Sequence, residues 1–556
     1  MRLLRSLSVG VCVVALAGCA TRNGHVDHLA TAAPKAQRFD GLGAHTRTIT
    51  TSSPEAQAYF NQGLAWMYAF NHDEAIRSYA RAAEIDPECA MAWWGIAVCE
   101  GPNYNDPVMT PERNAGAWSA LQEALARIDN TSPVERDLIL ALSKRYANPA
   151  PKDRAHLETA YADAMAEVWE KYPNDSEVGT LYAESLMVKR PWMLYTVDKE
   201  PEPDTPAIVA TLEKVMAMDP GNPGANHLYI HAVEPSMNPD RAIPAADRLS
   251  RQVPTAGHLL HMPSHIYIQT GMWDRSIEQN ALAMEADEAY RQRSHDHGIQ
   301  YMYQAHNAHM LAFTAMMIGR EEKAMESARA MWTTIPEELL EPVAPYVDLW
   351  MCSIYDVQKR FGRWNDLLAE PAPPESLPIT TAIWRAHRAI AFAAKKDFPA
   401  AKREQELFRQ AKAAIPEETV FGTDTAHRIL ETSEHFIAGE IALQQGQWDS
   451  AIAHLEKGVE AEDILWYAEP PQYLQPIRHT LGAVYLAAGR YTDAERIYRE
   501  DLARWRDNGW SLYGLSRALT GQGKLAEAEE AMRKHREMWA QADAPTETSC
   551  MCLPEV

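Results

Sequence analysis

Small and aromatic residues recur at fixed offsets along much of the chain, separated by polar and charged positions. The first clear copy of the pattern contains Gly63, Trp66, Ala75, Tyr79, Ala82 and Pro87. The same offsets return at Gly482, Tyr485, Gly489, Tyr491, Ala494 and Tyr498, and 34 residues further on at Gly523, Ala528 and Met532. Self-similarity at a period of this length is typical of a repeat architecture. A single unit cannot bury its own apolar face, so the pattern predicts a solenoid of stacked units.

The pattern resembles the tetratricopeptide repeat family, in which each unit is a pair of antiparallel helices. The resemblance implies that the small residues let two helices approach and that the large ones fill the space between them. First helices are then expected to start near Ala56, Ala90, Ser176, Pro223, Gly257, Ala305, Asp348, Ala382, Thr432, Gln475 and Gly509. The predicted fold is all-α, a right-handed superhelical solenoid of about eleven such units over residues 54–540, with a histidine-rich centre at 223–310.

Proline-rich and turn-rich segments interrupt the repeats, and each is predicted to be a loop. They lie at residues 101–111, 199–206, 370–378 and 463–471. Residues 541–556 are expected to form a loose C-terminal tail, so truncation from Ala540 is expected to leave the fold intact. The tail contains Cys550 and Cys552, a pair that suits a soft metal ion such as copper or zinc and equally suits simple oxidation.

The first residues have the form of a secretory signal. Arg2 and Arg5 precede a short apolar run, residues 7–17, that is too brief to span a bilayer as a permanent helix. The run ends in Leu-Ala-Gly-Cys at residues 16–19, which resembles the bacterial lipoprotein box. The resemblance implies cleavage before Cys19 and lipidation of that residue.

These features predict a signal peptide at 1–18 and a lipidated, flexible tether at 19–53. The protein is then expected in the cell envelope, held to the outer membrane by its lipid anchor and facing the periplasm. An unlipidated secreted protein is the alternative, because residues 15–17 read Ala-Leu-Ala, which also suits a signal peptidase.

Composition excludes several classes of protein. The chain has 556 residues, of which 46% are hydrophobic and 23% charged, so it is long enough to bury a large core. Its formal net charge of -23 repels phosphate backbones, and nucleic acid is therefore not an expected partner. The seven cysteines have no regular spacing and do not indicate a disulfide framework. The sequence contains no phosphate-binding loop, dinucleotide fingerprint or nucleophile elbow.

Histidines are concentrated in the centre of the predicted solenoid. Nine of the 20 histidines lie between His227 and His309, where even spacing would place about three. In repeat register they fall mainly at positions 2, 5 and 9 of three consecutive first helices, and Glu234 falls at position 12. At about 100° per residue these positions share an arc of roughly 80° on one helix face. In tetratricopeptide repeat proteins that face lines the concave groove, so the side chains are expected to converge.

The converging side chains form a candidate metal site. The predicted ligands are His227, His231, Glu234, His258, His261, His265, His306 and His309. Imidazole is the commonest metal-binding side chain, and histidines three or four residues apart on a helix can share one ion. Pro263 falls inside the same helix as His258 and His261 and is expected to kink it or delay its start. His295 and His297 are expected to belong to a solvated loop.

The leading hypothesis is an envelope-anchored repeat lipoprotein whose groove binds a transition metal, namely zinc, copper or iron. The first alternative is a scaffold that binds a protein or peptide without metal, with the imidazoles contacting an anionic group or packing. The second is a metalloenzyme that activates water or oxygen at the same ion. Enzyme activity is not the favoured interpretation. His227 and His231 have the spacing of the zinc protease helix, but Leu228 stands where that motif carries its glutamate.

Overall fold

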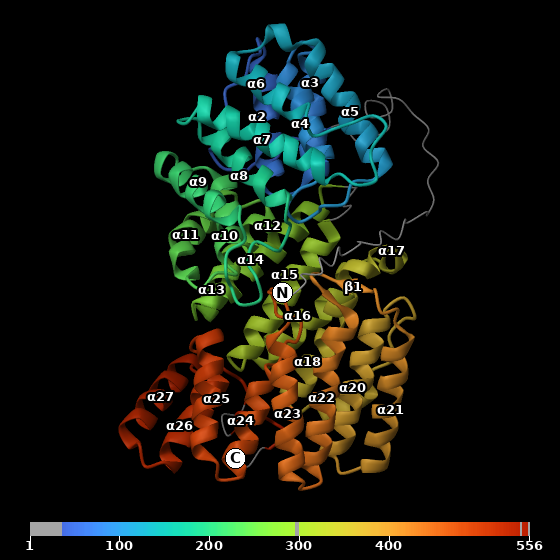
Figure 1. Ribbon diagram of the computed structural model, residues 1–556, viewed down its shortest axis with the longest axis vertical. Helices are drawn as coiled ribbons and strands as arrows, with labels where there is room; N and C mark the ends of the chain where they lie inside the picture. Colours follow the sequence, from blue (N-terminus) through green and yellow to red (C-terminus); the bar gives the residue numbers. More distant parts are fainter. Residues whose placement is uncertain (1–35, 295–299, 545–547, 554–556) are drawn as a thin grey trace, which may run out of the picture.

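The computed structural model describes residues 36–294, 300–544 and 548–553. Within them the chain is an all-α superhelical solenoid of antiparallel helix pairs, as predicted (Figure 1). The first five pairs are α2 (Pro54–Tyr68) with α3 (His72–Ile85), α4 (Ala90–Glu100) with α5 (Pro111–Ala126), α6 (Pro133–Leu142) with α7 (Ala155–Lys171), α8 (Ser176–Val188) with α9 (Thr205–Met218), and α10 (Pro223–Val233) with α11 (Ile243–Gln252).

The central and C-terminal units follow the same plan with local irregularities. They are α12 (Gly257–His261) and α13 (Pro263–Gln269) with α14 (Trp273–Arg291), α15 (Gln300–Met317) with α16 (Glu321–Thr334), α17 (Glu337–Val347), α18 (Ser353–Arg360) with α19 (Trp364–Ala369), α20 (Pro378–Ala394) with α21 (Phe398–Ala414), α22 (Ala426–Gln444) with α23 (Trp448–Asp463), α24 (Ile477–Ala487) with α25 (Tyr491–Arg504), and α26 (Gly509–Gly521) with α27 (Leu525–Met538). Three 3-10 helices, η1 (Ile128–Asn130), η2 (Pro239–Ala242) and η3 (Asp348–Cys352), and the short strands β1 (Val420–Phe421) and β2 (Asp424–Thr425) complete the described elements.

The repeated glycines and aromatic residues explain how neighbouring units pack. The ring of Tyr79 on α3 lies between the first helices of two successive units, where a Cβ added to Gly63 or Gly95 would lie 2.7 Å from it. Tyr498 on α25 lies in the same way against Gly482 and Gly514, at 2.3 and 2.1 Å. Any larger residue at these four glycines would push the aromatic ring out of its place. The alternation of small and large residues therefore sets the spacing between units.

Helices begin within two residues of most starts that the repeat pattern indicated, but Ala305, Ala382 and Thr432 lie four to six residues inside α15, α20 and α22. The four interrupting segments are largely loops. One pair, α6 with α7, lies where the pattern indicated no unit. Its first helix carries a capping box, because Ser132 and Glu135 each bond the other's backbone N–H. That local signal at Ser132 could have revealed the missing unit.

The expected tether is wrong for its described part, residues 36–53. Phe39 is only 6% exposed and packs edge-on against Trp66, with ring centroids 5.2 Å apart. The backbone N–H and hydroxyl of Thr50 both donate to Glu135. Two apolar side chains, Phe39 and Ile49, thus hold a segment whose composition otherwise indicated flexibility. The signal peptide, Cys19 and the rest of the tether lie outside the described residues.

The expectation of a loose C-terminal tail is also wrong for the described residues. The N–H groups of Asp543 and Ala544 both donate to the carbonyl of Gly319. Further on, Cys550 and Cys552 are buried and joined by a disulfide. The small and polar residues of this segment make backbone and side-chain contacts inside the solenoid. The amino-acid composition of the segment did not indicate these contacts. Truncation from Ala540 would therefore remove contacts that the fold makes.

The C-terminal units turn back against the middle of the chain. The indole N–H of Trp273 donates to the carbonyl of Arg506 over 2.9 Å, and that of Trp510 donates to the carbonyl of Met316 over 2.8 Å. Arg506 also forms an ion pair with Asp240 at 2.7 Å. Figure 1 shows the red helices α25–α27 below the green α13. This return brings the loop between α23 and α24 to the centre of the molecule.

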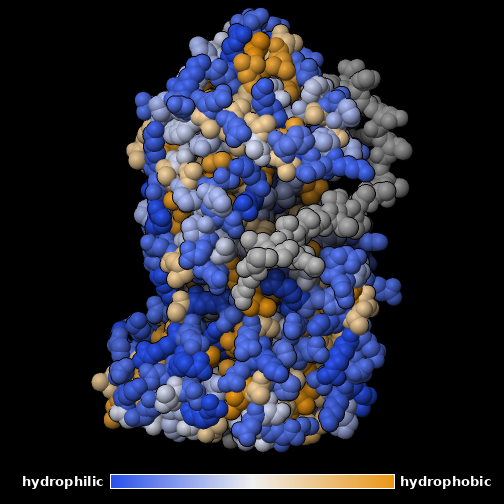
Figure 2. All heavy atoms as spheres, in the orientation of Figure 1, coloured by the Kyte–Doolittle hydropathy of each residue, from blue (hydrophilic) through white to orange (hydrophobic). Residues whose placement is uncertain are grey.

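The face seen in Figure 2 is predominantly hydrophilic, with scattered apolar side chains, in keeping with the high charge. Among the described residues no helix is both long enough and apolar enough to cross a bilayer.

Candidate metal centre

Four first-helix segments, α10, α12, α13 and α15, place the central histidines inside the superhelix. The side chains are buried rather than spread along an open groove, because two segments cover them. His227, His231, His258, His261, His265 and His309 are each at most 5% exposed. The turn after α2 covers one side, with the ring of Phe70 4.5 Å from that of His227. The loop before α24 covers another side with Glu469, which contacts His265.

Pro263 breaks the helix in which it lies, as its position predicted. The segment divides at Met262 into α12 and α13. His258 and His261 lie on the first piece and His265 on the second. All three still face the interior, so the break adjusts the rings without separating them.

The first triad consists of His227, His231 and His258, whose ligand-type nitrogen atoms all lie within 4.8 Å of one another. Nδ1 of His227 lies 2.7 Å from the carbonyl oxygen of Tyr68 and donates to it. Nε2 of His227 lies 3.2 Å from Nε2 of His258. Nδ1 of His231 donates to Glu234 over 3.1 Å, and its buried Nε2 has no hydrogen-bond partner among the described residues.

The second triad consists of His261, His265 and His306, with the same mutual limit of 4.8 Å. Nδ1 of His261 donates to the side-chain oxygen of Asn280 over 2.7 Å. The Asn280 amide group donates to the Ser276 carbonyl, which fixes its oxygen toward the histidine. Nδ1 of His265 lies 2.6 Å from an oxygen of Glu234, and the Nε2 atoms of His261 and His265 are 2.7 Å apart.

Four of these rings thus have Nδ1 directed at a hydrogen-bond acceptor. They are His227, His231, His261 and His265. An imidazole that donates from Nδ1 carries its lone pair on Nε2, the atom that binds a metal. Two Nε2 lone pairs at 2.7 Å repel each other unless a hydrogen on one of the nitrogens or a metal ion lies between them.

Glu234 links the two triads. One carboxylate oxygen accepts from His231 and the other accepts from His265. Glu234, which the sequence predicts as a ligand, thus contacts a ring of each triad. Glu234, His265 and Glu469 also converge, each offering one ligand-type atom within 4.8 Å of the others.

Glu469 is a site residue that sequence reasoning missed. It lies in the loop between α23 and α24, 2.8 Å from Nδ1 of His265. Gln269 and Tyr467 both donate to its Oε1. No periodicity connects this loop to the histidines, since only the return of the C-terminal units brings it there.

Burial and mutual repulsion control the charges of the cluster. Burial and then neighbouring imidazoles hold the pKa of His227, His258, His261 and His306 well below 6.5. For His265 burial lowers the pKa, but the charges of Glu234 and Glu469 outweigh it and raise the pKa to about 10. In the absence of metal, the charges of these carboxylates therefore favour a proton on His265 over one on its neighbours.

His309 is separate from both triads. Its ring lies 6.2 Å from that of His306 and 5.7 Å from Trp350, centroid to centroid. Burial lowers its pKa to about 3, so it is a neutral neighbour. The predicted loop residues His295 and His297 lie outside the described residues.

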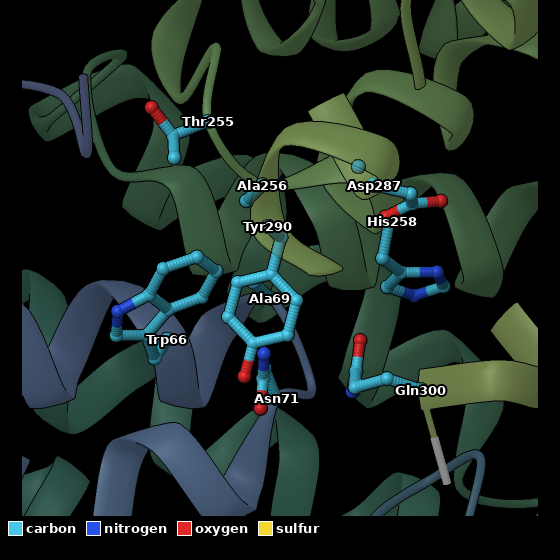
Figure 3. A pocket seen from close by; sticks show the side chains of 10 residues that line it. Trp66, Ala69, Asn71, Thr255, Ala256, His258, Asp287, Tyr290 and Gln300 are labelled. Carbon is cyan, nitrogen blue, oxygen red and sulfur yellow. The ribbon is translucent and has the colours of Figure 1, made fainter. Parts of the chain in front are cut away.

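A narrow pocket adjoins the first triad (Figure 3). The aromatic rings of Trp66 and Tyr290 line one part, and the polar side chains of Asp287, Gln300 and His258 line another. Burial raises the pKa of Asp287 to about 7. His258 is thus shared between the pocket and the first triad.

Comparison with known proteins agrees with the fold. Two tetratricopeptide repeat family models match residues 56–89 and 485–538. The chain therefore contains tetratricopeptide repeats near both ends of its solenoid. Repeats of this kind build scaffolds for protein–protein interaction, and the solenoid is of that type. No curated protein sequence matches the chain.

Several solved repeat structures are similar in outline. A human IFIT1 dimer with m7Gppp-AAAA is 13% identical, with 88% of this chain and 91% of that chain covered and a TM-score of 0.32. The APC/C hetero-tetramer Cut9-Hcn1 is 12% identical, with 86% and 79% covered and a TM-score of 0.31. Yeast Tom70 is 10% identical, with 87% and 90% covered and a TM-score of 0.28.

Proposed function

We propose that this repeat scaffold holds a transition-metal centre in its interior, bound by the histidines of α10, α12, α13 and α15. One observation carries the proposal. Four buried rings have Nδ1 committed to Tyr68, Glu234 or Asn280 and therefore direct the Nε2 lone pair inward. Metal-binding histidines characteristically donate their other N–H to a carboxylate or carbonyl in this way.

The donor set indicates the type of metal. Imidazole suits zinc, copper, iron and nickel, whereas calcium and magnesium prefer oxygen ligands. Each triad supplies three nitrogen donors and leaves a further coordination position open, as in catalytic zinc sites. The centre therefore accommodates one ion per triad.

The two triads differ in how closely the spacing of their nitrogen atoms matches that around a bound metal. With metal–nitrogen distances of about 2.0–2.1 Å and tetrahedral angles, two ligand nitrogens lie roughly 3.3 Å apart. The Nε2 atoms of His227 and His258 are already 3.2 Å apart. The Nε2 atoms of His261 and His265 are only 2.7 Å apart and have to separate before both can bind one ion. The first triad is the primary site, and the second fills after His265 loses its proton.

The test is the metal content of purified protein, with His231→Ala and His265→Ala compared with the parent. The parent is expected to carry stoichiometric metal and to gain thermal stability when zinc, copper or iron is added. A ligand present at 1,000 times its Kd adds about 4 kcal/mol to the free energy of unfolding. His231→Ala should lose the first ion and His265→Ala the second, while the partly exposed control His454→Ala keeps both. A metal-free parent that no ion stabilises would contradict the proposal.

Protein or peptide binding without metal is the second candidate function. It is favoured by the two family models, which match repeats known as interaction scaffolds. Metalloenzyme activity is a narrower form of the first, favoured by the pocket that His258 shares. Metal content separates the two candidates, and turnover of a small substrate lost with His258→Ala would establish the enzyme.

We further propose that a lipid on Cys19 holds the protein at the outer membrane, facing the periplasm. Support comes from the sequence Leu-Ala-Gly-Cys at residues 16–19, after a short apolar run. The parent is expected in the membrane fraction and Cys19→Ala in the soluble fraction of a bacterial host. Equal distribution of the two would refute the anchor.

A further inference from the structure

A second group of metal-binding side chains lies in the C-terminal half, apart from the histidines. It contains Glu440 on α22 with Cys550 and Cys552 of the C-terminal segment. One ligand-type atom of each lies within 4.8 Å of the others, and all three residues are buried. The sulfurs of Cys550 and Cys552 are joined as a disulfide, which explains why they lie together. The disulfide does not explain why the carboxylate of Glu440 is buried beside them.

Glu440 is the observation that points to a ligand. Its side chain is 2% exposed, and no described residue forms a hydrogen bond with its Oε2 atom. A buried carboxylate without a partner is costly, and either a proton or a cation offsets that cost. Lys359 is the nearest source of positive charge that acts on it, but the amino group of Lys359 donates to Tyr473 instead.

The sulfur of Cys550 has contacts of the kind found around bound thiolates. The N–H of Cys552 donates to the sulfur of Cys550 over 3.3 Å, and the Thr480 hydroxyl lies 3.4 Å from the same sulfur. Gln444 donates to the carbonyl of Cys552 over 2.8 Å, which holds the segment against α22. Such contacts orient metal ligands and moderate their charge.

We propose that, once the disulfide is reduced, Cys550, Cys552 and Glu440 bind a divalent ion of the zinc type. A dithiol reductant supplies two electrons and two protons, breaks the sulfur–sulfur bond and becomes a disulfide itself. The two thiols then lose their protons to solvent as the ion binds both sulfurs and the carboxylate. The three ligands carry three negative charges, of which the ion offsets two and Lys359 the third. Sulfur ligands with one carboxylate suit zinc, and an open fourth position remains.

The test uses the full chain, stripped of metal and reduced anaerobically with a phosphine, and cobalt(II) as a coloured substitute for zinc. Sulfur-to-cobalt charge transfer absorbs in the near ultraviolet, and histidine-bound cobalt lacks this band. The parent should develop it with one equivalent of cobalt beyond those bound by histidine. His231→Ala should keep the band, so the outcome does not depend on the histidine centre.

Three variants decide the assignment. Cys550→Ser and Cys552→Ser should each weaken or abolish the band, and Glu440→Gln should keep it but weaken binding roughly tenfold or more. Cys352→Ala, which removes a buried thiol elsewhere, should behave as the parent. Circular dichroism before and after reduction shows whether each variant is folded. The proposal is overturned if the folded, reduced parent gives no band, or if the band survives in the double cysteine variant.

Discussion

Histidines are buried in two regions of this solenoid, but their partners differ. In the C-terminal units His387 and His479 each have a carboxylate of their own. Nε2 of His387 lies 2.9 Å from Asp356, and Nε2 of His479 lies 2.9 Å from Asp501. In the central units the rings meet one another, and Glu234 is shared by two of them.

The difference lies in which nitrogen is used. In the C-terminal pairs Nε2 is occupied by a carboxylate, so no lone pair is left to converge with another. In the central units the acceptors contact Nδ1 and leave Nε2 directed inward. His387 and His479 therefore differ from the central rings in which nitrogen meets the acceptor, and that choice decides whether Nε2 is left to converge with other rings.

Removing a C-terminal carboxylate should produce the largest effect on stability. Asp501 accepts hydrogen bonds from His479, Ser511 and Asn508, and all of them are buried. Breaking such a buried pair costs about 3–5 kcal/mol. Asp501→Ala should lose that much in urea unfolding while its metal content stays at the level of the parent. Asp493→Ala on the same helix removes only a surface pair with Arg490 and should cost less than about 1 kcal/mol. Loss of metal in Asp501→Ala would erase the distinction between the two regions.

Replacing the shared carboxylate of Glu234 should change the affinity for metal instead. Glu234→Gln can no longer accept from both His231 and His265, and loss of such an orienting contact weakens metal binding about 10–100-fold. The measurement is competition with a chromophoric chelator. The matched control is Asp356→Asn, an equally buried partner of His387, which should leave metal affinity unchanged. Equal effects of the two variants would show that Glu234 is not special.

Acidification should have the smallest of these three effects, and it should act through the histidine–carboxylate pairs of the C-terminal units. Burial lowers the pKa of His387 more than the charge of Asp356 raises it. The stability that this neutral ring contributes is full above the unfolded pKa of about 6.5 and is lost as pH falls below it, because only the unfolded chain takes up the proton. One such group contributes at most about 1.4 kcal/mol per pH unit. The slope of the unfolding free energy between pH 6.5 and 5.5 should therefore be smaller in His387→Gln by up to that amount, and parallel slopes would contradict the prediction.

The architecture was predictable because it is local and repeated. Each aromatic residue such as Tyr79 packs against glycines such as Gly63 and Gly95 of adjacent helices, so one period contains the packing rule. The register of that period also placed His227, His231 and His265 on one face. Both predictions rest on contacts between neighbouring units.

The features that the sequence did not predict depend on contacts between segments that lie far apart in the chain. Glu469 reaches His265 only because the last units return to the centre, and no periodic signal describes that return. The backbone carbonyl of Tyr68 selects the tautomer of His227, and a carbonyl leaves no trace in composition. The predictions of a flexible tether and a loose tail were wrong for the same reason, because Phe39 and Cys550 are buried by partners far away in sequence.

The contact made by Glu469 also has a consequence for the order of assembly. Gln269, its partner beside the second triad, leaves the ribosome 200 residues before it. The newly made central units must therefore persist with one side of the histidine cluster uncovered until the final quarter of the polypeptide exists. An ion of the kind proposed above would be fully enclosed only after this last part of the chain has been made.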